Sequence, residues 1–83
     1  MKDRIEIIGI LNEIFEDIID EGPVYLLENS TSKDIEGWDS LTNIQIVVGI
    51  EKHFNIRFTS EEIISWNNVG EMIDCILNKN TNQ

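Results

Sequence analysis

Very few side chains of this chain have the chemistry of a catalytic centre, because its 83 residues include one histidine and one cysteine. A serine nucleophile needs a base within hydrogen-bond reach. Ser40 and His53 fall on the same predicted helix, on the order of 20 Å apart at a rise of about 1.5 Å per residue. A catalytic pair of Ser40 and His53 is therefore excluded if both lie on that helix, and we expect the protein not to be an enzyme.

The other reactive groups also lack a catalytic or metal-binding pattern. Cys75 lies at the edge of the apolar stripe of the last predicted helix, where a small, partly buried hydrophobe is the favoured interpretation. The loop acids Asp34, Glu36 and Asp39 lack the ligand spacing and the central glycine of an EF-hand loop. We therefore predict no metal site, and we interpret His53 as a polar-face residue near a helix C-terminus.

Ser40, in the segment EGWDSLTNI at residues 36–44, lies where a helix is predicted to begin. A hydroxyl in the first turn lies near free amides and the positive end of the helix dipole, which favour an added phosphate. A serine that follows Asp39 is also among the commonest capping choices. The residues alone leave both interpretations open: a helix cap, or a site where a phosphate is attached.

Hydrophobic periodicity predicts a first helix of about four turns. Asp3 and Glu6 have the spacing of a capping box, and Gly22 with Pro23 stops the helix. Its buried stripe is predicted to contain Ile5, Ile8, Leu11, Ile14, Phe15, Ile18 and Ile19.

Residues 20–39 form a connection longer than the roughly 12 to 15 residues at which structureless loops become uncommon. It therefore needs anchors over the core, and we expect these to be Val24, Leu26, Leu27 and Ile35. The stretch VYLLE within it can form a turn of helix.

A second helix is predicted from Asp39 or Ser40 to about His53. Its apolar residues cover well over half of the circumference, which is too wide for a helix that rests on one neighbour. The helix is therefore either packed from several sides or exposes part of its apolar surface to a partner. These residues are Leu41, Ile44, Ile46, Val47, Val48, Ile50 and Phe54.

The stretch FNIRF at residues 54–58 alternates like a strand, but no second strand is predicted to pair with it. We interpret it as an extended strap whose apolar side chains fill the core. Thr59 with Glu62 caps a short third helix, and Asn68 with Glu71 caps a fourth.

The predicted fold class is all-α, a small four-helix bundle with three longer helices, one short helix and a long loop between the first two. A chain of this length makes one domain, here residues 1–83. Residues 1–2 and 78–83 are predicted to be frayed. Because the aromatic and aliphatic residues fill space, we expect no large preformed cavity and little burial of long chains.

The net charge of −10 repels phosphate backbones and anionic lipid headgroups. We therefore expect neither nucleic acid nor membrane as a partner, while an acidic carrier or adaptor and a merely soluble domain both fit the charge. The N-terminal residues have no signal-peptide pattern, and no apolar run approaches the roughly 20 residues of a membrane span. With a single cysteine, the expected location is the cytoplasm.

The order of these elements resembles that of acyl carrier proteins, from the first helix to about Leu77. The centre of the resemblance is the Asp-Ser-Leu motif at residues 39–41 within GWDSL, preceded by a long anchored loop. It is followed by an apolar helix that ends in EKHF, the FNIRF strap, and then SEEII and NVGEMIDCI. The resemblance implies a helical bundle of acyl-carrier type that performs no chemistry of its own.

The resemblance also implies a cofactor and partners. Ser40 is expected to carry a 4'-phosphopantetheine arm, transferred from coenzyme A by a separate phosphopantetheinyl transferase, whose thiol holds acyl groups as thioesters. The expected partners are this transferase, an acyl-loading ligase or acyltransferase, and downstream synthase enzymes. The carrier itself is expected to be a monomer.

The helix after Ser40 is the docking element that the resemblance implies. One edge of it resembles the acidic strip of carriers for fatty-acid synthesis, but Gln45 and Lys52 replace the expected acids. Docking is therefore expected to depend more on apolar contact than on salt-sensitive pairing. The predicted partner-binding residues are Asp39, Leu41, Gln45, Val48 and Glu51.

Trp38 and Glu36 also differ from the residues often found before the motif in fatty-acid carriers. They favour a dedicated pathway, such as a polyketide or other secondary metabolite, a surface polysaccharide or an activated amino acid, over fatty-acid synthesis. Two alternatives stay open at this point. One is an unmodified acidic adaptor that binds a protein through the helix after Ser40, and the other is a peptidyl or aminoacyl carrier.

Overall fold

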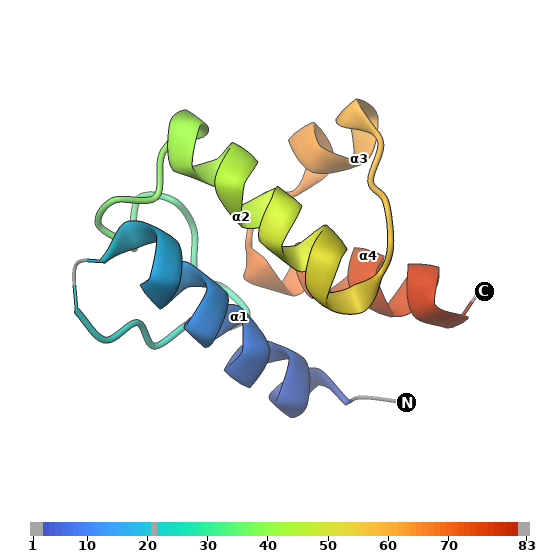
Figure 1. Cartoon of the computed structure of the whole chain (residues 1–83), viewed down its shortest axis with the longest axis horizontal. Coiled ribbons are helices and arrows are strands. Elements are labelled where there is room, and N and C mark those ends of the chain that lie inside the picture. The colour runs from blue at the N-terminus through green and yellow to red at the C-terminus, as the bar shows by residue number, and fades with distance from the viewer. Residues whose placement is uncertain (1–2, 21, 82–83) are drawn as a thin grey trace.

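The computed structural model describes residues 3–20 and 22–81, which form four helices and no strand (Figure 1). The helices are α1 (Arg4–Ile19), α2 (Ser40–Phe54), α3 (Ser60–Ser65) and α4 (Val69–Thr81). This confirms the predicted all-α bundle with three longer helices, one short helix and a long loop between the first two.

The helix α1 begins where the cap predicts. The carboxylate of Asp3 accepts a hydrogen bond from the backbone N–H of Glu6 at 2.9 Å. The predicted stripe is wrong in one respect, because Ile5 is 82% exposed whereas Ile7 is fully buried. Apolar residues at both positions fit two overlapping stripes, and packing against α2 and α4 selects the one through Ile7 and Leu11.

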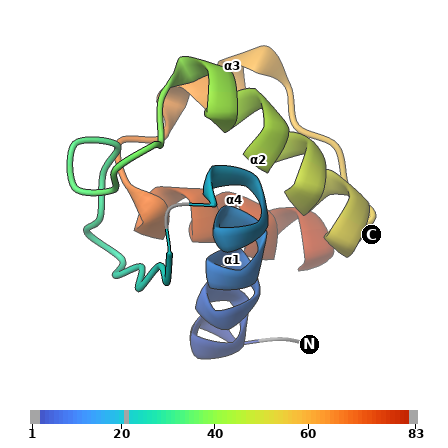
Figure 2. The same cartoon turned by 60° about the vertical axis from the view of Figure 1, so that its left-hand side comes forward.

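The connection between α1 and α2 is anchored along α1 in an extended conformation (Figure 2). The backbone N–H of Val24 donates to Oε2 of Glu16 at 2.9 Å, and that of Leu26 donates to Oδ1 of Asn12 at 2.9 Å. Because side chains alternate along an extended chain, Leu26 is buried and Leu27 is 65% exposed. The predictions of a helical turn in VYLLE and of an anchoring role for Leu27 are therefore wrong.

The far end of this connection is tied to α4. The backbone carbonyls of Glu28 and Ser30 accept hydrogen bonds from Gly70 and Val69, at 2.7 and 3.0 Å. The guanidinium of Arg4 also binds the carboxylate of Glu28, so α1, the connection and α4 meet at one point. The loop that precedes the DSL motif is thereby held at both ends.

The helix α2 lies across α1 (Figures 1 and 2). It buries only part of its wide apolar surface. Ile46, Val47 and Ile50 are buried. The remaining apolar residues on the outer side are exposed, so the helix is not covered from all sides. That a partner covers this surface stays a prediction. The buried core is completed by Ile7, Leu11, Phe15, Val24, Leu26, Ile56, Val69, Met72, Ile73 and Ile76.

The predicted strap at residues 54–58 connects α2 to α3 and buries Ile56. The backbone N–H of Phe58 in this strap donates a hydrogen bond to Oε2 of Glu51 at 2.8 Å. Thr59 and Glu62 then form the predicted capping box of α3, in which each side chain accepts a hydrogen bond from the other's backbone N–H.

The start of α4 is capped almost as predicted. Oδ1 of Asn68 accepts the backbone N–H of Glu71 at 2.9 Å, but the carboxylate of Glu71 reaches Asn67 instead of Asn68. The helix α4 continues to Thr81, and Lys79 pairs with Glu62 at 2.9 Å. Fraying of residues 78–83 stays a prediction. Residues 1–2 and 82–83 lie outside the described part of the chain.

None of the described helices has the length and apolar character that crossing a membrane requires.

Candidate attachment and docking site

Ser40 is the first residue of α2, and its side chain is exposed. Within the described residues its hydroxyl makes no hydrogen bond, although the same helix start is densely bonded through Asp39 and Thr42. The hydroxyl is therefore free to react with an incoming group. Of the two interpretations that the sequence left open, the helix cap does not apply to Ser40, because its side chain caps no backbone N–H.

The cap is Asp39. Its Oδ1 accepts the backbone N–H groups of Leu41 and Thr42, both at 2.9 Å, and Thr42 Oγ1 accepts the backbone N–H of Asp39 in return. The Thr42 hydroxyl also donates to the carbonyl of Gly37 at 2.7 Å, which ties the helix start to the loop. Sequence reasoning missed Thr42, although an Asp followed three residues later by a side chain with a free oxygen is a capping-box signal.

These hydrogen bonds have an electrostatic consequence. The N–H of Thr42, with further help from its hydroxyl and from the N–H of Leu41, holds the pKa of Asp39 below its usual range. Asp39 is therefore a negative charge beside Ser40 across the neutral pH range. It also occupies two of the amides that the sequence suggested for binding a phosphate.

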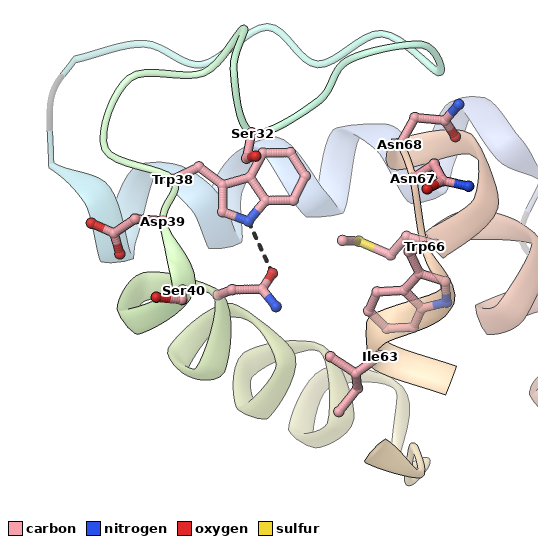
Figure 3. Close-up of a pocket in the computed structure, with 10 residues that line it drawn as sticks. Ser32, Trp38, Asp39, Ser40, Ile63, Trp66, Asn67 and Asn68 are labelled. Carbon is pink, nitrogen blue, oxygen red and sulfur yellow. Dashed lines mark hydrogen bonds between the residues drawn. The ribbon is translucent and has the colours of Figure 1, made fainter. Parts of the chain in front are cut away.

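A pocket of about 290 Å³ opens beside Ser40, between the start of α2, α3 and the start of α4 (Figure 3). Trp38 and Trp66 lie on opposite sides of it. The indole Nε1–H of Trp38 donates to Oδ1 of Asn43 at 2.9 Å, and its ring packs edge-on against Phe15 at 4.9 Å between centroids. The lining residues are Ser32, Trp38, Asp39, Ser40, Asn43, Ile63, Trp66, Asn67, Asn68 and Met72.

The predicted docking residues Leu41, Gln45 and Val48 are exposed on one side of α2, with Leu41 69% and Val48 43% accessible. The structure adds Ile44, which is 64% exposed on the same side and which the sequence signals by its position one turn after Leu41. We call Leu41, Ile44 and Val48 the apolar edge of α2. Glu51 is half-buried and its carboxylate accepts the Phe58 N–H, so its part in docking stays a prediction.

The remaining reactive groups lie away from Ser40. His53 is exposed in the last turn of α2, where its ring contacts Phe54. Cys75 is half-buried, and burial, followed by the nearby charge of Glu62, raises the pKa of its thiol. A raised pKa leaves little reactive thiolate at neutral pH. Within residues 3–20 and 22–81, no cluster of histidine, cysteine and acidic side chains has the arrangement of a metal site.

Comparison with known protein families matches the family described as "Phosphopantetheine attachment site" over residues 9–76. The chain belongs to this family. It is accordingly a carrier protein with covalently attached 4'-phosphopantetheine, and not an enzyme. Its interactions include, in general terms, a phosphopantetheinyl transferase and biosynthetic enzymes.

Comparison with solved structures gives the same result. The chain is similar to the holo acyl carrier protein from Geobacter metallireducens, whose solution structure it matches with a TM-score of 0.82 and 29% identity, over 90% of this chain and 86% of that one. A search of curated proteins returns no match. The chain is thus an acyl carrier homologue, as the resemblance of its motifs predicted.

Proposed function

We propose that this chain is a single-domain acyl carrier protein in which Ser40 carries the 4'-phosphopantetheine arm. The observation that supports this most is that the Ser40 hydroxyl, at the start of α2, is exposed and makes no hydrogen bond within the described residues. In the transfer, Ser40 Oγ forms a phosphodiester with the phosphopantetheine of coenzyme A. Adenosine bisphosphate leaves, and the hydroxyl proton passes to the transferase.

The other serines fit this role less well. Ser30 is buried, and its hydroxyl accepts the N–H of Leu27, while the Ser65 hydroxyl donates to the carbonyl of Glu62. Ser32 is exposed in the connection, where no helix follows it. Ser60 begins α3, a helix of 6 residues, so it has less surface for a partner to recognise than Ser40 on α2.

The charge of Asp39 favours an arm that is directed away from the helix end. The phosphodiester is itself an anion, and Asp39 already accepts the N–H groups of Leu41 and Thr42. Like charges repel, so the phosphate is expected to turn from Asp39 towards solvent or the neighbouring pocket. An arm held in this way is accessible to successive enzymes at a high effective concentration.

The apolar edge of α2 is the proposed docking surface for the transferase and for later enzymes. Leu41, Ile44 and Val48 are exposed at helical spacing beside Ser40, with the uncharged Gln45 between them. Burial of this surface against a partner is driven by removal of apolar area from water. Docking is therefore expected to weaken little when salt is added.

The docking proposal can be tested with matched lysine variants. Val48→Lys interrupts the apolar edge, whereas Ile64→Lys places the same change on α3, where Ile64 is 81% exposed. We expect Val48→Lys to lower kcat/KM for arm transfer at least several-fold at both low and high salt, and Ile64→Lys to leave it close to the wild-type value. Equal loss in both variants would count against docking through α2.

The cargo is proposed to be an acyl group of a specialised pathway, such as polyketide or other secondary-metabolite synthesis, with fatty-acid synthesis or an aminoacyl cargo as alternatives. Trp38, which begins the WDSL segment, supports a specialised carrier because its indole forms one wall of the pocket beside Ser40. The alternative of an unmodified adaptor is set aside, because the chain belongs to the family described as "Phosphopantetheine attachment site".

Intact mass spectrometry tests the attachment directly. The purified protein is incubated with coenzyme A, Mg²⁺ and a promiscuous phosphopantetheinyl transferase. The wild type is expected to gain the mass of one arm and Ser40→Ala none. Ser60→Ala is the matched control, because Ser60 is also the first residue of a helix, and it is expected to gain one arm. An adduct that persists in Ser40→Ala would overturn the assignment.

A further inference from the structure

The pocket beside Ser40 contains a hydrogen-bond donor whose orientation is fixed and which has no partner. The Trp38 indole can only donate, so its hydrogen bond of 2.9 Å identifies the Asn43 atom that accepts it as Oδ1. The Nδ2 group of Asn43 is therefore the free end of the amide. It donates no hydrogen bond to any described residue, although the Asn43 side chain is half-buried.

The neighbouring amides do not offer the same group. Nδ2 of Asn67 already donates to Oε1 of Glu71 at 3.3 Å. Asn68 accepts the N–H of Glu71 through its Oδ1, and its amide is directed away from the two indole rings (Figure 3). Asn43 is thus the side chain in this pocket that combines a fixed amide with a free donor.

The rest of the pocket restricts what Asn43 can bind. Trp66, Ile63 and Met72 provide apolar surface, while Asp39 places a negative charge at the rim beside Ser40. The charge disfavours an anionic group. The volume of about 290 Å³ lies at the lower end of the roughly 300 to 1,000 Å³ of ligand pockets, so only a small group fits.

We infer that this pocket selects a short acyl cargo that carries a neutral oxygen acceptor, a hydroxyl or a ketone, near the thioester. This inference rests on the proposed arm at Ser40, which folds back over the rim and brings the cargo to the pocket. The oxygen of the cargo accepts a hydrogen bond from Nδ2 of Asn43, and its carbons pack between Trp38 and Trp66. Asn43 is the residue that determines this specificity.

The chemistry of the donor explains the selection. A plain alkyl cargo that fills the pocket displaces water from the Nδ2 group of Asn43 but offers no hydrogen-bond acceptor in its place. The NH₂ group of Asn43 is then left without a hydrogen-bond partner. A site that binds through a hydrogen bond therefore rejects the analogue that lacks the partner. An ammonium group gains no hydrogen bond from Asn43, because it meets another donor there, and its attraction to Asp39 favours a position at the rim instead.

Three cargoes of similar size test the inference: 3-hydroxybutyryl, butyryl and β-alanyl, each loaded onto Ser40 from its coenzyme A thioester. The measurement is the half-life of the protein thioester in hydroxylamine, divided by that of the same coenzyme A thioester. We expect the ratio for 3-hydroxybutyryl to exceed the other two about two- to tenfold, the equivalent of one net hydrogen bond. The side-chain amide signal of Asn43 is expected to shift in NMR spectra with that cargo alone.

Two variants separate the donor from its surroundings. Asn43→Asp keeps the acceptor for Trp38 but removes the free NH₂ group, and it is expected to abolish the protection of 3-hydroxybutyryl. Asn67→Asp adds the same charge to the pocket without removing that donor, and it is expected to retain the protection.

The outcomes distinguish this inference from the proposed function. Loading of all three cargoes with equal protection would overturn the inference about Asn43 and leave the arm at Ser40 intact. Protection of butyryl equal to that of 3-hydroxybutyryl, or protection that survives Asn43→Asp, would have the same meaning. Failure to load any cargo onto Ser40 would overturn the proposed function itself.

Discussion

Trp38 links the loop before the DSL motif to two helices, so its replacement should lower the stability of the protein in two separable steps. Its Nε1–H donates to Asn43 on α2 at 2.9 Å, and its ring packs edge-on against Phe15 on α1. Trp38→Phe removes the first contact and keeps an aromatic ring for the second. Trp38→Leu removes both contacts.

The magnitudes follow from the two contacts. A net hydrogen bond stabilises a protein by about 1 kcal/mol, and an edge-on aromatic pair adds about 1 kcal/mol beyond the area it buries. Trp38→Phe is therefore expected to lower the free energy of unfolding by about 1 kcal/mol. Trp38→Leu is expected to lower it by at least about 2 kcal/mol, because the smaller side chain also buries less apolar area. For a domain of this size, 1 kcal/mol corresponds to a fall in Tm of about 4 to 8 °C.

Thermal unfolding followed by circular dichroism measures the two steps. Trp66→Phe is the control, because the Trp66 ring packs edge-on against Phe58 and its indole N–H interacts with the sulfur of Cys75, a weak acceptor. It is expected to lower Tm less than Trp38→Phe. If Trp38→Phe had the same Tm as the wild type, the hydrogen bond to Asn43 would not contribute to stability and the reasoning would be refuted.

Three further predictions follow from the helix contacts and the core. Gly9→Ala is expected to raise the midpoint of urea unfolding, because the added Cβ meets nothing within 4 Å and alanine favours a helix over glycine by about 0.5 to 1 kcal/mol. Gly70→Ala is expected to lower this midpoint, because the added Cβ would lie 3.0 Å from the carbonyl oxygen of Glu28. The guanidinium of Arg4, hydrogen-bonded to Glu28, lowers the pKa of that carboxyl, so the pair stabilises the fold above the usual carboxyl pKa and is lost as pH falls through the lowered one. Arg4→Met should therefore flatten the acid side of the stability profile, and an unchanged profile would contradict this. Loading an octanoyl group should leave the NMR signals of the core methyl groups unshifted, because the core is filled; large shifts would show that the chain enters it.

The parts of the fold that the sequence predicts are those with local causes. Asp3, Thr59 and Asn68 each cap a helix through a residue three positions away, so their roles follow from spacing alone. The start of α2 at Ser40 and the strap that buries Ile56 follow from equally short patterns. Local signals therefore place all four helices.

The errors concern the side that an element presents to its neighbours. Ile5 is exposed because α1 packs through Ile7, and Leu27 is exposed because the connection is extended where the sequence predicts a helical turn. Local propensity does not determine these choices, since apolar residues occur on both sides. The choice depends on tertiary packing.

The site was predicted in part for the same reason. Ser40 and the apolar width of α2 are visible in the sequence, and the exposure of Leu41, Ile44 and Val48 explains that width. The contact of Trp38 with Asn43 is not visible, because it requires the loop to fold back against α2. The pocket likewise needs α3 and α4 to be in place.

The attachment of the arm to Ser40 is the central claim, and peptide mapping of the protein isolated from its own host tests it most directly. The protein is digested, and fragmentation locates the phosphopantetheine and any acyl group it carries. The account predicts the arm on the fragment that contains Asp39, Ser40 and Leu41, at the Ser40 side chain. An arm on any other serine, or its absence from the mature protein, would contradict the account.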